Sequence, residues 1–130
     1  MRVHVDDRRY FVGNLFADTL IYGDLNCVCL QPEVTIAWHR HQRQTDYLFC
    51  AKGTVKVGLT EGPGKSVRWE VLSDRQPREL VIPPNTWHGY RNIGPGLAII
   101  VGFNTQPYDP TDEERMAPAV MGHSWATVEK

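Results

Sequence analysis

The segment WHRHQRQTDYLFCAKG at residues 38–53 brings imidazole and carboxylate groups together in a strand-like context. His39 and His41 are two residues apart, so on a β-strand both point to the same face, because successive side chains alternate between faces. Asp46 begins the next apolar run and would approach both histidines after a turn. These groups could hold a metal ion, act as acid and base on a substrate, or be ordinary polar residues of a strand.

Strict alternation also predicts the neighbours of these groups. It places Ala37 on the face of the two histidines and turns Trp38 to the opposite face. In the following run it places Leu48 and Cys50 on the same face as Asp46. A hairpin that joins the two runs therefore brings three polar groups to one side of a sheet.

Short strand-like runs separated by turns dominate the rest of the chain. Alternation of apolar residues is clear at 67–71 and 97–103, and the segments EGPGK, PPN and GPG indicate turns. The strand candidates are residues 26–31, 34–41, 45–53, 54–60, 66–72, 78–83, 88–93 and 96–103. Many short strands at this spacing predict an all-β sandwich or barrel. Only residues 110–117 suggest a helix, which Thr111 would cap.

Length and charge restrict the class of protein. A chain of 130 residues predicts a single domain over 1–130, with a core at about 13–110 and a C-terminal tail at about 111–130. The formal net charge of −1 gives no reason to expect nucleic-acid binding. No apolar run approaches the ~20 residues of a membrane helix, and the N-terminus lacks the apolar core of a signal peptide. We therefore expect a cytoplasmic protein that binds no membrane.

The three cysteines are expected to be reduced. Cys27 and Cys29 share one strand face, where a disulfide between residues i and i+2 would be strained. Cys50 lies in an apolar run, and no CxxC spacing indicates a zinc site. We interpret all three as small buried hydrophobic residues.

A second stretch, VIPPNTWHGYRNIG at residues 81–94, supplies a third histidine. His88 follows a proline-rich turn, and Asn92 lies four residues later. Together the two stretches resemble the two signature motifs of the cupin superfamily. Asp46 stands where a glutamate is usual, and Asn85 replaces a glycine, which asparagine can do because it tolerates positive φ. The resemblance implies a single-domain cupin β-barrel, the double-stranded β-helix or jelly roll.

Within the cupins, AWHRHQRQTDYLFCAKGTVKVGL, IPPNTWHGYRN and NTQPYDPTDEER resemble a short branch of the dTDP-4-dehydrorhamnose 3,5-epimerase-like nucleotide-sugar cupins. The resemblance implies a metal-free epimerase or isomerase of a keto-sugar nucleotide, in which His39 removes a proton α to a ketone. Gln44 falls on a matching glutamine. Asp46 stands where the family has an enolate-stabilising lysine, and Ile36 where it has a phosphate-binding arginine. The C-terminal acid that orients the family's histidine is not expected in this shorter chain.

These observations define the site hypothesis. The catalytic set is His39, Asp46, His88 and Tyr108. The substrate-binding set is His41, Gln44, Arg40, Tyr90 and Arg91.

Two alternatives stay open. One is a mononuclear metal cupin, a dioxygenase or isomerase of a small acid or ketone, that binds Zn, Fe, Mn or Ni. Its ligands would be His39, His41, Asp46 and His88. The other is a cupin that binds sugar without catalysis.

The expected partners are a nucleotide sugar and a second copy of the chain, since small barrels with exposed sheet edges favour pairing into homodimers.

Overall fold

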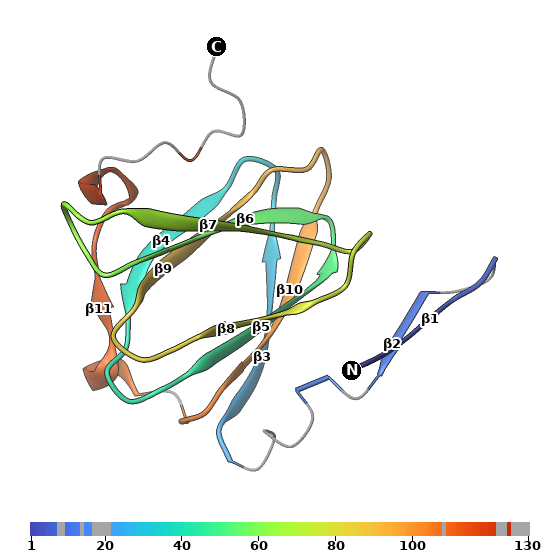
Figure 1. The fold of residues 1–130 in the computed structure, drawn as a ribbon, viewed down its shortest axis with the longest axis horizontal. Coiled ribbons are helices and arrows are strands. Elements are labelled where there is room, and N and C mark those ends of the chain that lie inside the picture. The colour runs from blue at the N-terminus through green and yellow to red at the C-terminus, as the bar shows by residue number, and fades with distance from the viewer. Residues whose placement is uncertain (8–9, 14, 17–21, 108, 122–124, 126–130) are drawn as a thin grey trace.

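The computed structural model describes residues 1–7, 10–13, 15–16, 22–107, 109–121 and 125. Two antiparallel sheets form the walls of a barrel (Figure 1). The first has the strand order β3-β10-β5-β8 and the second the order β11-β4-β9-β6-β7. The strands are β3 (Asp24–Leu30), β4 (Thr35–Arg40), β5 (Asp46–Lys52), β6 (Thr54–Thr60), β7 (Val67–Ser73), β8 (Glu79–Ile82), β9 (Trp87–Asn92), β10 (Ala98–Asn104) and β11 (Glu114–Arg115). All eight strand candidates from the sequence are confirmed, and with them the all-β cupin jelly roll.

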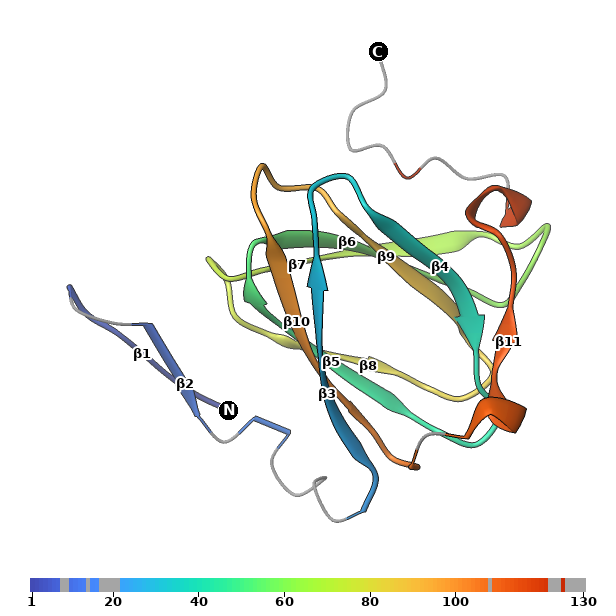
Figure 2. The ribbon, with the colours of Figure 1, turned by 180° about the vertical axis from the view of Figure 1, so that it is seen from behind.

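A separate hairpin of β1 (Arg2–Val5) and β2 (Tyr10–Gly13) precedes the barrel. It extends from the side of the barrel opposite β11, as the view from behind shows (Figure 2). Among the described residues, no helix is long and apolar enough to cross a membrane.

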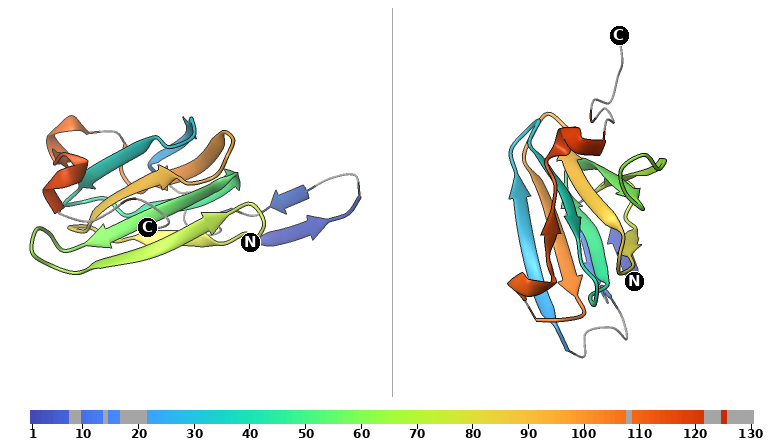
Figure 3. Two further views of the ribbon diagram at one scale, coloured as in Figure 1. Left: turned by 90° about the horizontal axis from the view of Figure 1, so that it is seen from above. Right: turned by 90° about the vertical axis from the view of Figure 1, so that its left-hand side faces the viewer.

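Three apolar clusters hold the layers together. The inner core lies between the two sheets, which face each other in Figure 3, and includes Leu48, Cys50, Val55 and Ile100. On the outer face of the five-stranded sheet lies the tryptophan cluster, which consists of Trp38, Trp87, Met121 and Trp125. On the outer face of the four-stranded sheet lies the phenylalanine cluster, which consists of Phe16, Phe49 and Phe103. As expected, Leu48 and Cys50 face inward with Asp46, because β5 alternates regularly.

The pairing of β4 with β9 contains a register shift between Ala37 and His39. The shift adds a residue to β4, so the face of each side chain changes at this point. Ile36 therefore packs against the inner core, whereas Ala37 packs with the tryptophan cluster. The expectation that Ala37 shares the face of the histidines is wrong, since a bulge breaks strict alternation. Trp38 faces outward, as predicted.

The C-terminal segment differs from its expected helix. Residues Pro110–Asp112 form a single 3₁₀ turn capped by Asp109 rather than Thr111. The chain then extends, so that β11 pairs with β4. A second 3₁₀ turn, Pro118–Met121, brings Met121 into the tryptophan cluster. Residues beyond the predicted core at about 13–110 thus contribute a strand and buried side chains to the barrel.

The three cysteines form no disulfide, as expected, but only one of them is buried. Cys50 belongs to the inner core, whereas Cys27 and Cys29 are exposed on the outer side of β3. The interpretation of Cys27 and Cys29 as buried residues is wrong, because β3 is an edge strand whose outer face no other described element covers. Asn85 adopts φ 62°, in agreement with its place in the glycine position of the second motif.

Asn92 joins three parts of the barrel, and we predict that Asn92→Ala destabilises it strongly. Its amide donates to the carbonyl oxygens of Leu30 at 2.9 Å and Gly96 at 2.8 Å, and its oxygen accepts from the Gly94 amide at 3.0 Å. The side chain is 1% exposed, so truncation leaves buried groups without partners. Urea unfolding should report a loss of about 3 kcal/mol in the free energy of unfolding.

The matched control is Asn26→Ala, because Asn26 is half-buried and its amide donates only to Asp24 among the described contacts. Equal losses for the two variants would contradict the role given to Asn92.

Candidate active site

A cavity of about 300 Å³ opens at the end of the barrel where β4 and β10 end and where β3, β5 and β9 begin. All three motif histidines reach it. The described side chains that line it are Asp24, Asn26, Val28, Ile36, His39, His41, Gln44, Asp46, Leu48, His88, Tyr90, Ile100, Asn104, Asp109 and Glu113. The list includes four carboxylates and no lysine or arginine, so the wall of this cavity is acidic.

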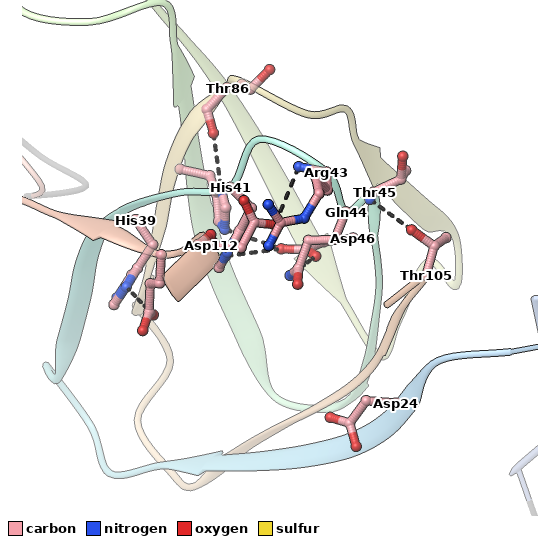
Figure 4. A network of polar contacts seen from close by, with 12 residues as sticks. Asp24, His39, His41, Arg43, Gln44, Thr45, Asp46, Thr86, Thr105 and Asp112 are labelled. Carbon is pink, nitrogen blue, oxygen red and sulfur yellow. Dashed lines mark hydrogen bonds and ion pairs between the residues drawn. The ribbon is translucent and has the colours of Figure 1, made fainter. Parts of the chain in front are cut away.

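Each of the three imidazoles is held at its Nδ1 atom. His39 Nδ1 lies 3.1 Å from Glu113 Oε1, His41 Nδ1 lies 3.1 Å from the main-chain oxygen of Asp112, and His88 Nδ1 lies 2.9 Å from that of Thr86. A carbonyl oxygen can only accept, so His41 and His88 carry their proton on Nδ1. Figure 4 shows His39, His41 and Asp46 in one polar network, to which Asp112 also belongs.

Asp46 is the centre of the polar cluster. Its Oδ1 accepts from the side-chain amide of Gln44 at 2.6 Å. Its Oδ2 lies 3.2 Å from His88 Nε2 and 3.9 Å from His41 Nε2. Asp46 and His88 are each 7% exposed, so water screens this charge weakly. The ligand atoms of His41, Asp46 and His88 lie within 4.8 Å of one another, a separation at which they could share one cation.

His39 lies outside that cluster, and its surroundings shift its pKa. Burial is the main cause that lowers the pKa of His39 below its ordinary value, and the neighbouring His88 lowers it further. Glu113 opposes this shift. Burial alone would raise the pKa of Glu113, but Arg115 and then His39 outweigh it and lower this pKa. His39 is therefore neutral at pH 7, with an ionised carboxylate against Nδ1 and with Nε2 available as a proton acceptor.

Tyr90, which belongs to the expected substrate-binding set, lines the cavity. Burial and, after it, the charge of Asp46 raise the pKa of Tyr90 to about 12. Its hydroxyl therefore stays protonated at neutral pH and can donate a hydrogen bond. Tyr108, expected as a catalytic residue, lies outside the described residues.

Of the expected substrate-binding residues, the structure brings His41, Gln44 and Tyr90 to the cavity. The two arginines are elsewhere. Arg40 pairs with Glu114 at 2.7 Å and stacks over Trp87, and Arg91 donates to the Thr35 hydroxyl at 3.0 Å. Neither arginine lines the cavity, because both side chains point away from the cavity side of the sheet.

Sequence reasoning missed Asp112 and Glu113. Asp112 ends the 3₁₀ turn and Glu113 follows it, and each contacts one histidine of the first motif. The expectation that no C-terminal acid orients His39 is therefore wrong, since Glu113 does so. The signal in the sequence was the acidic run Asp112–Glu114, which the prediction of a helix placed behind its Thr111 cap.

Comparison with known proteins identifies the family of this chain. Residues 31–117 match the family model described as "FdtA: WxcM-like, C-terminal". The probable low-salt glycan biosynthesis epimerase Agl13 of Haloferax volcanii is 32% identical over 93 residues, which are 65% of this chain and 60% of that protein. The spore coat polysaccharide biosynthesis protein SpsL of Bacillus subtilis is 29% identical over 136 residues, with coverage of 95% and 90%.

Among solved structures, a dTDP sugar isomerase from Desulfovibrio desulfuricans superposes with a TM-score of 0.85 at 22% identity. The superposition covers 98% of this chain and 88% of that one, which establishes a shared fold. The family match spans both histidine motifs and the segment that contains Asp112 and Glu113. This chain therefore belongs to the FdtA family of WxcM-like, C-terminal domains.

Proposed function

We propose that this protein is an epimerase or ketoisomerase of a nucleotide-linked keto sugar, with His39 as its general base. The observation that carries the proposal is the contact of a neutral, cavity-facing imidazole with the Glu113 carboxylate at 3.1 Å. A general base must be unprotonated before it acts and must accept a positive charge when it does. The names of Agl13, an epimerase, and of the dTDP sugar isomerase support the choice of substrate class.

The reaction is a proton transfer through an enolate. Nε2 of His39 takes the proton from the carbon next to the ketone, and the electrons of that C–H bond form a carbon–carbon double bond. The carbonyl oxygen then carries the negative charge. Return of a proton to the opposite face of the same carbon gives an epimer. Return of the proton to the former carbonyl carbon, with transfer of the hydroxyl proton of the first carbon to the former carbonyl oxygen, moves the ketone. Neither outcome needs an oxidant or a reductant.

The enolate oxygen needs hydrogen-bond donors or positive charge. Tyr90 supplies a hydroxyl that stays protonated at neutral pH. Since Asp46 stands where the 3,5-epimerase-like cupins have a lysine, positive charge in a metal-free protein has to come from His41 or His88, whose Nε2 atoms converge on that carboxylate. Glu113 stabilises the imidazolium that forms on His39, as a carboxylate beside a catalytic histidine does.

A second candidate is a metal-dependent cupin, favoured by the donor set around Asp46. His41 and His88 both donate Nδ1–H to main-chain oxygens, the usual arrangement behind metal-bound imidazoles, and direct Nε2 toward the same carboxylate. Two imidazoles and a carboxylate suit Zn, Fe, Mn or Ni. His39, expected as a fourth ligand, is not part of this group. A bound cation would supply the positive charge that a lysine supplies in the 3,5-epimerase-like cupins.

We also propose a homodimer that pairs through β3, and a location in the cytoplasm as the sequence indicated. β3 is an edge strand of its sheet, and Leu25, Cys27 and Cys29 are exposed on its outer side, Leu25 by 63%. An uncovered apolar edge strand is a ready template for pairing. A two-fold contact is the commonest way to cover it.

Replacement of His39 tests the leading proposal. In D2O, the protein should exchange deuterium into dTDP-4-keto-6-deoxyglucose at the carbons that flank the ketone, as followed by proton NMR. Loss of a general base should slow exchange by ~100-fold or more in His39→Asn. The position of the label and of the carbonyl distinguishes epimerisation from ketone migration.

The control for this test is His4→Asn, because His4 lies in the separate hairpin and pairs with Asp6. It should exchange at the wild-type rate. If wild type binds keto-sugar nucleotides but exchanges none of them, the protein is a sugar-binding cupin and the proposal is wrong.

Metal content tests the second candidate. Protein purified without chelator or affinity metal should contain one transition metal ion per chain by elemental analysis. His41→Ala and Asp46→Ala should lose it, whereas His39→Asn should retain it, because His39 is outside the cluster. Metal far below one per chain, in protein also incubated with each candidate ion and dialysed, would reject this candidate.

The molecular mass in solution tests the dimer. Light scattering should give twice the chain mass of 14.8 kDa. Leu25→Glu should shift the protein toward the single chain, because it places charge on the proposed contact. Val71→Glu, a similarly exposed apolar position on β7 of the other sheet, should leave the mass unchanged. A wild-type mass of one chain would contradict the proposal.

A further inference from the structure

We propose that Asp112 is a positioning residue that fixes the orientation and tautomer of His41 and the path of the chain that leads to Asp46. The proposal rests on the proposed function only for the consequence in catalysis. Asp112 does not itself line the cavity, so any effect it has on the reaction must act through its neighbours.

Asp112 accepts hydrogen bonds from three consecutive residues, His41, Gln42 and Arg43. Its main-chain oxygen accepts from His41 Nδ1 at 3.1 Å, and its carboxylate accepts from the amides of Gln42 at 2.9 Å and Arg43 at 3.2 Å. These contacts span about 70 positions of sequence. Asp112 is 6% exposed, so water does not readily replace these bonds. An ionised carboxylate that accepts two main-chain N–H groups forms charge-assisted hydrogen bonds, which are stronger than neutral ones.

The held segment joins β4 to β5 and therefore connects the histidine motif to Asp46. Other contacts fix both of its ends. The His41 oxygen accepts from the Asn85 amide at 2.7 Å, and the Thr45 amide donates to the Thr105 hydroxyl at 2.9 Å. Between these two points, the Asp112 carboxylate is the acceptor for the main-chain amides of Gln42 and Arg43. The position of Gln44, which donates to Asp46, depends on this path.

The carbonyl contact also decides which nitrogen of His41 faces the cavity as an acceptor. Because the Asp112 oxygen cannot donate, neutral His41 must carry its proton on Nδ1, which leaves a lone pair on Nε2. That atom lies 3.9 Å from Asp46 Oδ2. The next residue, Glu113, contacts Nδ1 of His39 with its side-chain carboxylate, so two adjacent residues orient two histidines. Antiparallel pairing of β11 with β4 sets this correspondence.

Nitrogen-15 NMR of the histidine rings tests the proposal without any substrate. In wild type, neutral His41 should show its proton on Nδ1. Asp112→Asn keeps the size of the side chain but replaces one acceptor oxygen by a donor, so one of the two amides loses its partner. The His41 signals should then change toward a mixture of tautomers. Neutral His41 with its proton on Nε2 in wild type, or unchanged His41 signals in Asp112→Asn, would overturn the proposal.

Exchange kinetics supply the second readout. Asp112→Asn should lower kcat by about 10- to 100-fold with little change in KM, because loss of an orienting partner affects the reacting geometry more than binding. Glu114→Gln is the matched control, since Glu114 lies in the same segment but pairs with Arg40. It should change neither the His41 signals nor kcat. If no keto-sugar nucleotide is a substrate but the NMR result holds, the proposed function fails while the role of Asp112 stands.

Discussion

The antiparallel pairing of residues 114–116 with β4 determines where the acids of this site lie. Trp38 and Met116 exchange two main-chain hydrogen bonds, at 2.7 and 3.0 Å, and β11 continues the pairing to Arg40. The register of this pairing places Glu113 against His39 and Asp112 against His41. A shift of one residue would turn these acids away, because side chains alternate along an extended chain. The geometry of the polar wall therefore depends on a strand of only two residues.

Such a short strand needs support from outside the sheet, and the tryptophan cluster provides it. Trp38 is fully buried, and its indole donates to the Pro118 oxygen at 3.3 Å. Trp125 packs against Trp38 with ring centroids 5.0 Å apart. Full burial of a large apolar side chain stabilises a fold by about 1.5–3 kcal/mol. The same C-terminal segment thus supplies apolar anchors on the outer face of the sheet and acids at the mouth of the barrel.

The sequence predicted the barrel well because its strands depend on local patterns. Alternation and turn residues identified every strand from β3 to β10, and the two motifs predicted that His39, His41 and His88 belong to one site. The errors have physical causes. A bulge at Ala37 is not visible in a regular pattern, so Ile36 rather than Ala37 faces inward. Exposure of Cys27 follows from the place of β3 at a sheet edge, which depends on strand order.

The acidic C-terminal segment was the hardest to interpret. A proline followed by acids is typical of the first turn of a helix, and local pattern gave no reason to extend the chain there. Its conformation depends on pairing with β4, some 75 positions earlier, and on burial of the tryptophans. Glu113 and Asp112 could not be assigned to the histidines without that long-range contact.

The central claim is that neutral His39, held by Glu113, is the base. The pH dependence of deuterium exchange tests it most directly. Because burial and His88 lower the pKa of His39, the rate should be constant near neutral pH and fall only below pH 6.5, the ordinary value for histidine. In Glu113→Gln the plateau should be lower, and the fall should move to still lower pH, since the carboxylate that favours the imidazolium is gone. A fall at or above pH 6.5 in wild type, or the same profile in both proteins, would contradict the account.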